Sequence, residues 1–198
     1  MKQTKSKILA VAAVVLCCVL AMGGTLAYYT AESTAHNVIT TGDIHIKLFE
    51  EFDPEAAKKL VPGNTVDKVV TVMNTSSTAQ GDAWIRVQVE LDASINGDDL
   101  PVAILGPDDL EQPVALIDFN DQADDNWIYG GDGYFYYKTA VAPGEETQPL
   151  FTEVTLNPLM GNDYQESRID VDVYAQAVQA KNNPAPDGDV TRVTGWPK

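Results

Sequence analysis

Apolar and polar residues alternate along several stretches of this 198-residue chain, and this period of two limits the fold more than any other feature. Successive side chains of a β-strand point to opposite faces of the sheet, so each such stretch is typical of a strand with one buried face. The alternating stretches are Asp43 to Leu48, Trp84 to Leu91 and Arg168 to Ala177. Runs rich in β-branched or aromatic residues predict further strands at 66–73, 133–137 and 150–156.

Helical patterns are nearly absent from the same region. One short helix is predicted over residues 54–60, with Asp53 as its cap and Pro54 at its first position. Turn signals precede the predicted strands at Pro62-Gly63, at Pro143-Gly144 and in the run Gly130-Gly131-Asp132-Gly133. Short strands separated by turns predict an all-β fold, an antiparallel β-sandwich of jelly-roll type.

Two segments of the predicted domain are less regular. Residues 92–126 are rich in aspartate and turn dipeptides, which predicts a loop-rich insertion with one or two strands. Early in residues 181–198, Asn182 and Asn183 are followed by Pro184, which cannot donate a backbone hydrogen bond to a β-ladder. Residues 181–198 are therefore predicted to be an exposed tail. The β-sandwich domain is therefore expected to span residues 38–180.

The N-terminus has the pattern of an export signal. A basic start, Met1 to Lys7, precedes fifteen uncharged apolar residues, Ile8 to Met22. This run is short for a membrane-spanning helix, which needs about 20 residues, and Thr25 and Ala27 are small residues that a signal peptidase accepts. We expect residues 1–27 to form a helical signal peptide that meets the membrane transiently and is cleaved between Ala27 and Tyr28. An uncleaved anchor is the alternative, because the stretch lengthens if it continues to Ala27.

Cleavage would change the composition of the chain in two ways. It would remove both cysteines, Cys17 and Cys18, so the secreted protein would hold neither a disulfide nor a thiolate-bound metal. It would also remove three lysines, so the net charge of −16 would become −19. A polyanion of this kind repels phosphate backbones, which argues against nucleic-acid binding.

Ten residues then precede the predicted sandwich as an N-terminal arm without proline or glycine. Extended at about 3.3 Å per residue, the arm is long enough to span a strand of a neighbouring sheet. We expect it to act as a donor strand, and a fold-back onto its own sheet is the alternative. The arm comprises Tyr28, Tyr29, Thr30, Ala31, Glu32, Ser33, Thr34, Ala35, His36 and Asn37.

Several of these segments resemble one family, the TasA/camelysin group of exported Gram-positive proteins. The resemblance is carried by residues 24–30 at the signal junction, 37–44, 61–66, 83–87, 133–138, and 163–165 before 169–171. It implies a jelly-roll subunit of the biofilm matrix, processed by a SipW-type signal peptidase. In TasA the mature N-terminal segment completes the sheet of the next subunit. The expected partners are therefore other copies in a head-to-tail polymer, or related matrix proteins, at the cell surface or in the extracellular matrix.

The camelysin side of the resemblance raises the alternative of a secreted metallopeptidase. The chain has two histidines, His36 and His45, and no His-Glu-x-x-His motif, so the helical zinc-binding face of that chemistry is missing. It also has no Gly-x-Ser-x-Gly sequence to supply a serine nucleophile. We expect no catalytic residues and no cofactor. A soluble module that binds another surface protein is a further alternative.

An acidic segment, residues 118–125, raises the question of calcium. Ala123 stands where an EF-hand loop needs glycine, and Tyr129 where it needs a bidentate glutamate. The pattern is compatible with a weak irregular Ca²⁺ site that Asp108 and Asp109 would join. It is also compatible with a solvated acidic loop, which we favour. In the aromatic run 134–137, alternation predicts Phe135 and Tyr137 in the core, with Tyr134 and Tyr136 on the outer face.

Overall fold

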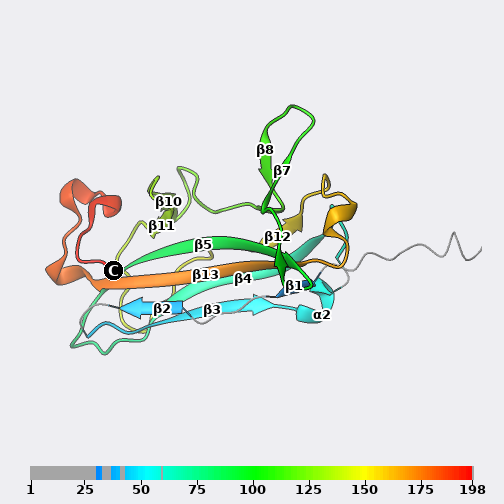
Figure 1. Ribbon diagram of the computed structural model, residues 1–198. Helices are drawn as coiled ribbons and strands as arrows, with labels where there is room; N and C mark the ends of the chain where they lie inside the picture. The colour runs from blue at the N-terminus through cyan, green and yellow to red at the C-terminus, as the bar shows by residue number, and fades with distance from the viewer. Residues whose placement is uncertain (1–29, 33–36, 41–42, 59, 198) are drawn as a thin grey trace, which may run out of the picture.

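The computed structural model describes residues 30–32, 37–40, 43–58 and 60–197, which form two β-sheets packed face to face (Figure 1). The first sheet has the order β1-β13-β5-β11-β10, with β2 also paired to β13 and β6 to β5. Its strands are β1 (Thr30–Glu32), β2 (Asn37–Thr40), β5 (Ala83–Ile95), β6 (Asp98–Asp99), β10 (Trp127–Tyr129), β11 (Tyr134–Tyr137) and β13 (Arg168–Gln179). The second sheet is β3 (Ile46–Phe52), β4 (Thr65–Asn74), β12 (Glu153–Leu156) and β9 (Ala115–Ile117), in that order. The all-β sandwich predicted from the sequence is confirmed.

The chain alternates between the two sheets in a jelly-roll-like manner. After β2 in the first sheet it enters the second for β3 and β4, returns for β5, crosses to β9, returns for β10 and β11, and crosses once more through β12 to β13. The long strands β5 and β13 pair antiparallel along their whole shared length, from Arg168 opposite Ser94 to Gln179 opposite Ala83. The departure from an antiparallel sandwich is at β1 and β2, which both pair with β13 in parallel.

The core lies between the inner faces of the sheets. Val87 of β5 and Val173 of β13 belong to one core cluster with Val70 and Val72 of β4, and all four are fully buried. Trp127 fills one end of this core, where its side chain is fully buried and its Nε1 donates a hydrogen bond to the Gln148 carbonyl at 2.9 Å. Alternation along each strand thus selects the buried face, as the sequence pattern requires.

The predicted strand boundaries are correct to within a few residues. The stretch 43–48 keeps its alternation, with Ile44 buried and His45 exposed, but the β3 ladder begins only at Ile46, opposite Asn74. Just before β3, the His45 N–H donates a hydrogen bond to the side-chain Oγ of Ser76 at 2.9 Å rather than to a carbonyl of a neighbouring strand. The predicted strand 150–156 is assigned from Glu153, although Leu150 already donates its backbone N–H to the Val70 carbonyl at 2.9 Å.

The helix and the irregular insertion differ more from their predictions. Helix α2 spans Pro54–Ala57 rather than 54–60. Leu60, beyond its end, is buried in the core. Its predicted cap is confirmed, since Asp53 Oδ1 accepts hydrogen bonds from the N–H groups of Glu55 and Ala56. The insertion holds four short strands rather than one or two: β6, β9 and the separate hairpin of β7 (Ala103–Leu105) with β8 (Glu111–Pro113), which projects from the sandwich in Figure 1.

The C-terminal segment, predicted as an exposed tail, is mostly exposed or half-buried, but it is folded and contacts the sandwich at a few residues. It forms three 3-10 turns, η2 (Ala180–Asn182), η3 (Pro186–Gly188) and η4 (Val190–Arg192), and both Val190 and Val193 are buried. The Trp196 ring lies 5.7 Å from the Tyr136 ring and 4.6 Å from the Arg86 guanidinium. Tyr136, predicted on an open outer face, is therefore buried, while Phe135 and Tyr137 lie in the core as expected.

Replacement of Trp127 by alanine tests the importance of this packing. We expect Trp127→Ala to lower the free energy of unfolding by about 3–5 kcal/mol, because it leaves a large cavity and an unpaired Gln148 carbonyl. Tyr129→Ala on the same strand, where the side chain is 49% exposed, should cost less than about 1 kcal/mol. Urea unfolding followed by tryptophan-independent far-UV circular dichroism measures both, and equal losses would contradict this account.

Candidate functional site

The predicted arm lies along the edge of the first sheet, on the side of β13 that β5 leaves open. In β1, Thr30, Ala31 and Glu32 stand opposite Arg168, Ile169 and Asp170. In β2, the four residues 37–40 stand opposite 174–177. Of the predicted arm 28–37, the structure describes residues 30–32 and 37, and these lie on their own sheet, which is the fold-back alternative. β2 continues into residues 38–40, the beginning of the predicted sandwich domain.

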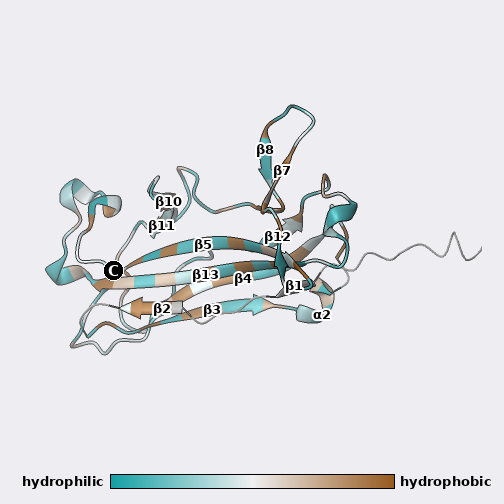
Figure 2. Ribbon diagram, viewed as in Figure 1, coloured by the Kyte–Doolittle hydropathy of each residue, from teal (hydrophilic) through white to brown (hydrophobic). Residues whose placement is uncertain are grey.

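This attachment is weak by comparison with the rest of the sheet. β1 and β2 contribute three and four ladder positions, whereas β5 contributes twelve to the other side of β13. Val38 and Ile39 remain 37% and 47% exposed, and Figure 2 shows β2 as an apolar strand at the margin of the sandwich. Short edge strands with little buried apolar surface are the segments that open most readily in a native protein. The arm is thus the part of this sheet best suited to exchange.

Other predicted residues of the export signal and arm lie outside the described residues. These are the signal segment 1–27 with Ala27, and Tyr28, Tyr29, Ser33, Thr34, Ala35 and His36. Among the residues that the structure describes, no helix is long and apolar enough to cross a membrane.

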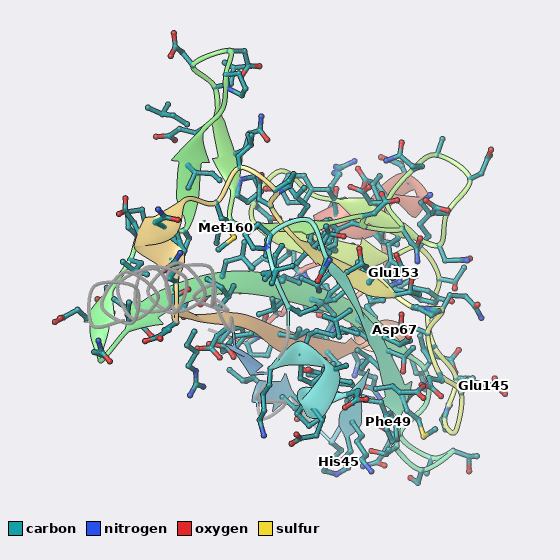
Figure 3. All side chains as sticks on the ribbon, turned by 90° about the vertical axis from the view of Figure 1, so that its right-hand side faces the viewer. His45, Phe49, Asp67, Glu145, Glu153 and Met160 are labelled. Carbon is teal, nitrogen blue, oxygen red and sulfur yellow. The ribbon has the colours of Figure 1, made fainter. Side chains whose placement is uncertain are left out.

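The histidines proposed for a peptidase are not brought together in the described structure. His45 is exposed just ahead of β3, at the periphery of the molecule in Figure 3, whereas His36 lies outside the described residues. Within the described ranges, no group of three or more His, Cys, Asp or Glu side chains is arranged to hold a metal ion.

The acidic segment 118–125 is organised around a lysine. The Lys138 ammonium donates hydrogen bonds to three backbone carbonyls of this loop, those of Gln122 at 3.2 Å, Ala123 at 3.0 Å and Asp125 at 2.6 Å. Asp125 in turn accepts a hydrogen bond from the Gln122 N–H at 2.9 Å. The carbonyl oxygens that an irregular calcium site would draw on here are therefore already occupied by a cationic side chain.

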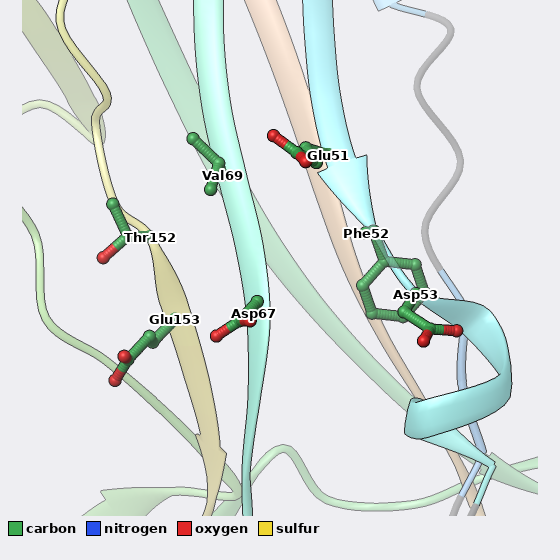
Figure 4. A pocket seen from close by; sticks show the side chains of 7 residues that line it. All are labelled: Glu51, Phe52, Asp53, Asp67, Val69, Thr152 and Glu153. Carbon is green, nitrogen blue, oxygen red and sulfur yellow. The ribbon is translucent and has the colours of Figure 1, made fainter.

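A second acidic feature could not be found from sequence spacing. A shallow hollow of about 390 Å³ on the second sheet is lined by carboxylates from three strands and the start of α2, among them Glu51, Asp67 and Glu153 (Figure 4). Asp53 also borders it but already caps the helix. Glu51 and Glu153 are about a hundred positions apart in the chain, and only the order β3-β4-β12 makes them neighbours.

An apolar hollow of about 360 Å³ opens between the sheets on the opposite side from the arm. Val89 and Leu91 of β5 form one wall, and Ile117 of β9 and Phe119 just beyond it form the other. The Phe119 ring stacks on Phe135, which also lines the hollow, with centroids 4.3 Å apart. Because β9 and β10 are short edge strands, the sandwich is incompletely sealed here.

Like charges face each other on the outer side of the β5–β13 ribbon. Asp170 stands opposite Asp92, and Asp172 stands opposite Glu90. Burial raises the pKa of the Asp172 carboxyl group, and the charges of Asp170, Asp92 and Glu50 raise it further, while Lys68 opposes them. Directly opposed like charges destabilise a sheet, so this block opposes folding when it is ionised.

No family model, curated protein or solved structure matches this chain. The residue geometry therefore carries the functional argument.

Asp172 should make stability depend on pH in a defined direction. A carboxyl group whose pKa is raised by folding stabilises the folded state below the ordinary aspartate pKa, and this contribution is lost as the pH rises through the raised value. At pH 7, Asp172→Asn should raise the free energy of unfolding by less than about 1 kcal/mol, because solvent screens a partly exposed group. The gain should vanish below the ordinary aspartate range. Urea titrations across pH measure it, with the exposed loop residue Asp124→Asn as control; a gain that grows on acidification would be inconsistent.

Proposed function

We propose that this chain is an exported subunit of an extracellular matrix of the TasA type, which assembles head to tail by exchange of its N-terminal arm. The observation that carries this proposal is the pairing of two short N-terminal segments, 30–32 in the arm and 37–40 at its end, in parallel on an otherwise open edge of β13. The export-signal pattern at 1–27 and the resemblance of several sequence segments to the TasA/camelysin group support the same interpretation.

Exchange is energetically accessible because it replaces one set of contacts by an equivalent set. In the isolated subunit, residues 30–32 and 37–40 pair with their own β13. In the polymer the same segments would pair with β13 of a neighbour, so the hydrogen bonds are conserved and chiefly the linker changes conformation. A contact of this kind joins two different surfaces, and it propagates into a filament when the rotation between subunits does not close a ring.

The edge of β13 that the N-terminal segments leave is the surface on which assembly would take place. A subunit whose arm has left presents the unpaired backbone of β13, which is the usual template for strand addition. The long pairing of β13 with β5 keeps this template in place while the arm is absent. The peptidase and binding-module alternatives have no observation among the described residues that favours them.

Processing gives the first test of this proposal. The exported protein should begin at Tyr28, since Thr25 and Ala27 fit the pocket of a signal peptidase. N-terminal sequencing of protein recovered from the cell surface measures the site, and Thr25→Arg with Ala27→Arg should block release. Surface protein that still begins at Met1 would show an anchored subunit instead.

Removal of the arm gives the second test. A protein that starts at Thr41, and so lacks both segments 30–32 and 37–40, should remain folded, because the twelve β5–β13 pairs are untouched, but it should form no filaments in negative-stain images. Circular dichroism and urea unfolding establish that this truncated protein folds. An excess of a synthetic peptide of residues 28–40 should also stop growth of the protein that begins at Tyr28, by filling the β13 edge, whereas a scrambled peptide should not. Filaments formed equally well by the truncated protein would rule out the arm as donor.

A further inference from the structure

An ion pair lies in the interior of the sandwich, between the two strands at one side of the second sheet. The Lys68 ammonium contacts the Glu50 carboxylate, and their side chains are only 2% and 4% exposed. In the β3–β4 register, Phe52 stands opposite Lys68 and Val70 stands opposite Glu50, so the two charged residues are diagonal neighbours on one face. The Phe52 ring centroid is 5.6 Å from Lys68 Nζ.

Such a pair is costly in its ionised form. Removing two charges from water costs several kcal/mol per ion, and the mutual attraction repays this only in part. Burial lowers the pKa of Lys68, against the opposing effect of its hydrogen bond to Glu50. Transfer of one proton from the ammonium to the carboxylate gives a neutral amine in contact with a neutral carboxylic acid. These two groups are the reactants of an amide bond.

We propose that Lys68 and Glu50 condense to an isopeptide bond that links β4 to β3. The Nζ lone pair attacks Glu50 Cδ, and a bond forms between these two atoms. The Cδ–O bond to the former hydroxyl group then breaks, and that oxygen leaves with two protons as one water molecule. The product is a neutral secondary amide, and no oxidant, reductant or further reactant is consumed.

The site supplies what such a condensation needs. Direct contact between the two groups gives a high effective concentration, which is worth several orders of magnitude in rate for a well-oriented pair. Exclusion of water favours loss of the water formed and removes the penalty of the two buried charges. The pair Lys58 and Glu55 has the same chemistry on the surface, with side chains 52% and 74% exposed, and it should remain an ordinary ion pair.

The proposed bond would do for this chain what a disulfide does elsewhere. No cysteine follows Cys18, so the sandwich has no thiol with which to join its strands. A Lys68–Glu50 link would close the loop that contains α2 and the Pro62-Gly63 turn, and it would prevent β3 from separating from β4. Closing a loop in this way restricts the unfolded chain and slows complete unfolding. This inference does not depend on filament formation or on export.

Tryptic peptide mapping of the full folded chain by mass spectrometry tests the proposal. Trypsin does not cleave after an acylated lysine, so the bond predicts one species in which residues 48–58 are joined to residues 60–86, with the summed mass less one water. Residue 68 should then be absent as a peptide terminus. Recovery of separate peptides 48–58 and 60–68 from folded protein would overturn the proposal.

Variants make the assignment specific. Lys68→Met and Glu50→Ala should each abolish the joined species, whereas Lys58→Met on the surface pair should leave the residue 68 cross-link in place. The peptide map of the unaltered protein shows whether the bond exists. That result therefore stands even if Lys68→Met or Glu50→Ala fails to fold. A joined species that persists in Glu50→Ala would place the bond on another carboxyl group and would also overturn the proposal.

Discussion

Twelve consecutive residue pairs join β5 to β13, and the other parts of the molecule are arranged around this ribbon. Its inner face supplies valines and isoleucines to the core cluster that also includes Val70 and Val72 of β4. Its outer face carries Arg86, on which the C-terminal segment closes through Trp196. Its open edge receives the N-terminal arm. A long antiparallel ladder can support all three because its own pairing does not depend on any of them.

The contrast between the two sides of β13 gives the proposed assembly its physical basis. On one side, pairing is long, antiparallel and backed by the core; on the other, it is short, parallel and partly exposed. Opening therefore affects the arm before it affects the sandwich. A subunit built in this way can lose its arm to a neighbour while it keeps the surface that accepts another arm.

Two lysines each compensate nearby polar or acidic groups. Lys138 provides the positive charge for an acidic loop, and Lys68 pairs with Glu50 between strands. On the β5–β13 ribbon, burial and the charges of Asp170 and Asp92 raise the pKa of Asp172, and the charge of Lys68 opposes them only in part. Lys68, which is buried, and Lys138, which is half-buried, thus each compensate groups that the fold brings beside them.

Alternation of apolar and polar residues by itself determined the fold class, the main strands and the buried face of each, because a β-strand has a fixed side-chain period of two. Local chemistry also determined the Asp53 cap and the turn at Gly131 and Gly133, both of which have positive φ. Tertiary structure alone decided that Val190 and Val193 are buried, that Tyr136 is buried with Trp196 against its ring edge, and that residues 30–32 and 37–40 lie on β13. It also decided the contact of Lys68 with Glu50. These features depend on which strands become neighbours, and strand order is set by packing over the whole chain, which no local pattern encodes.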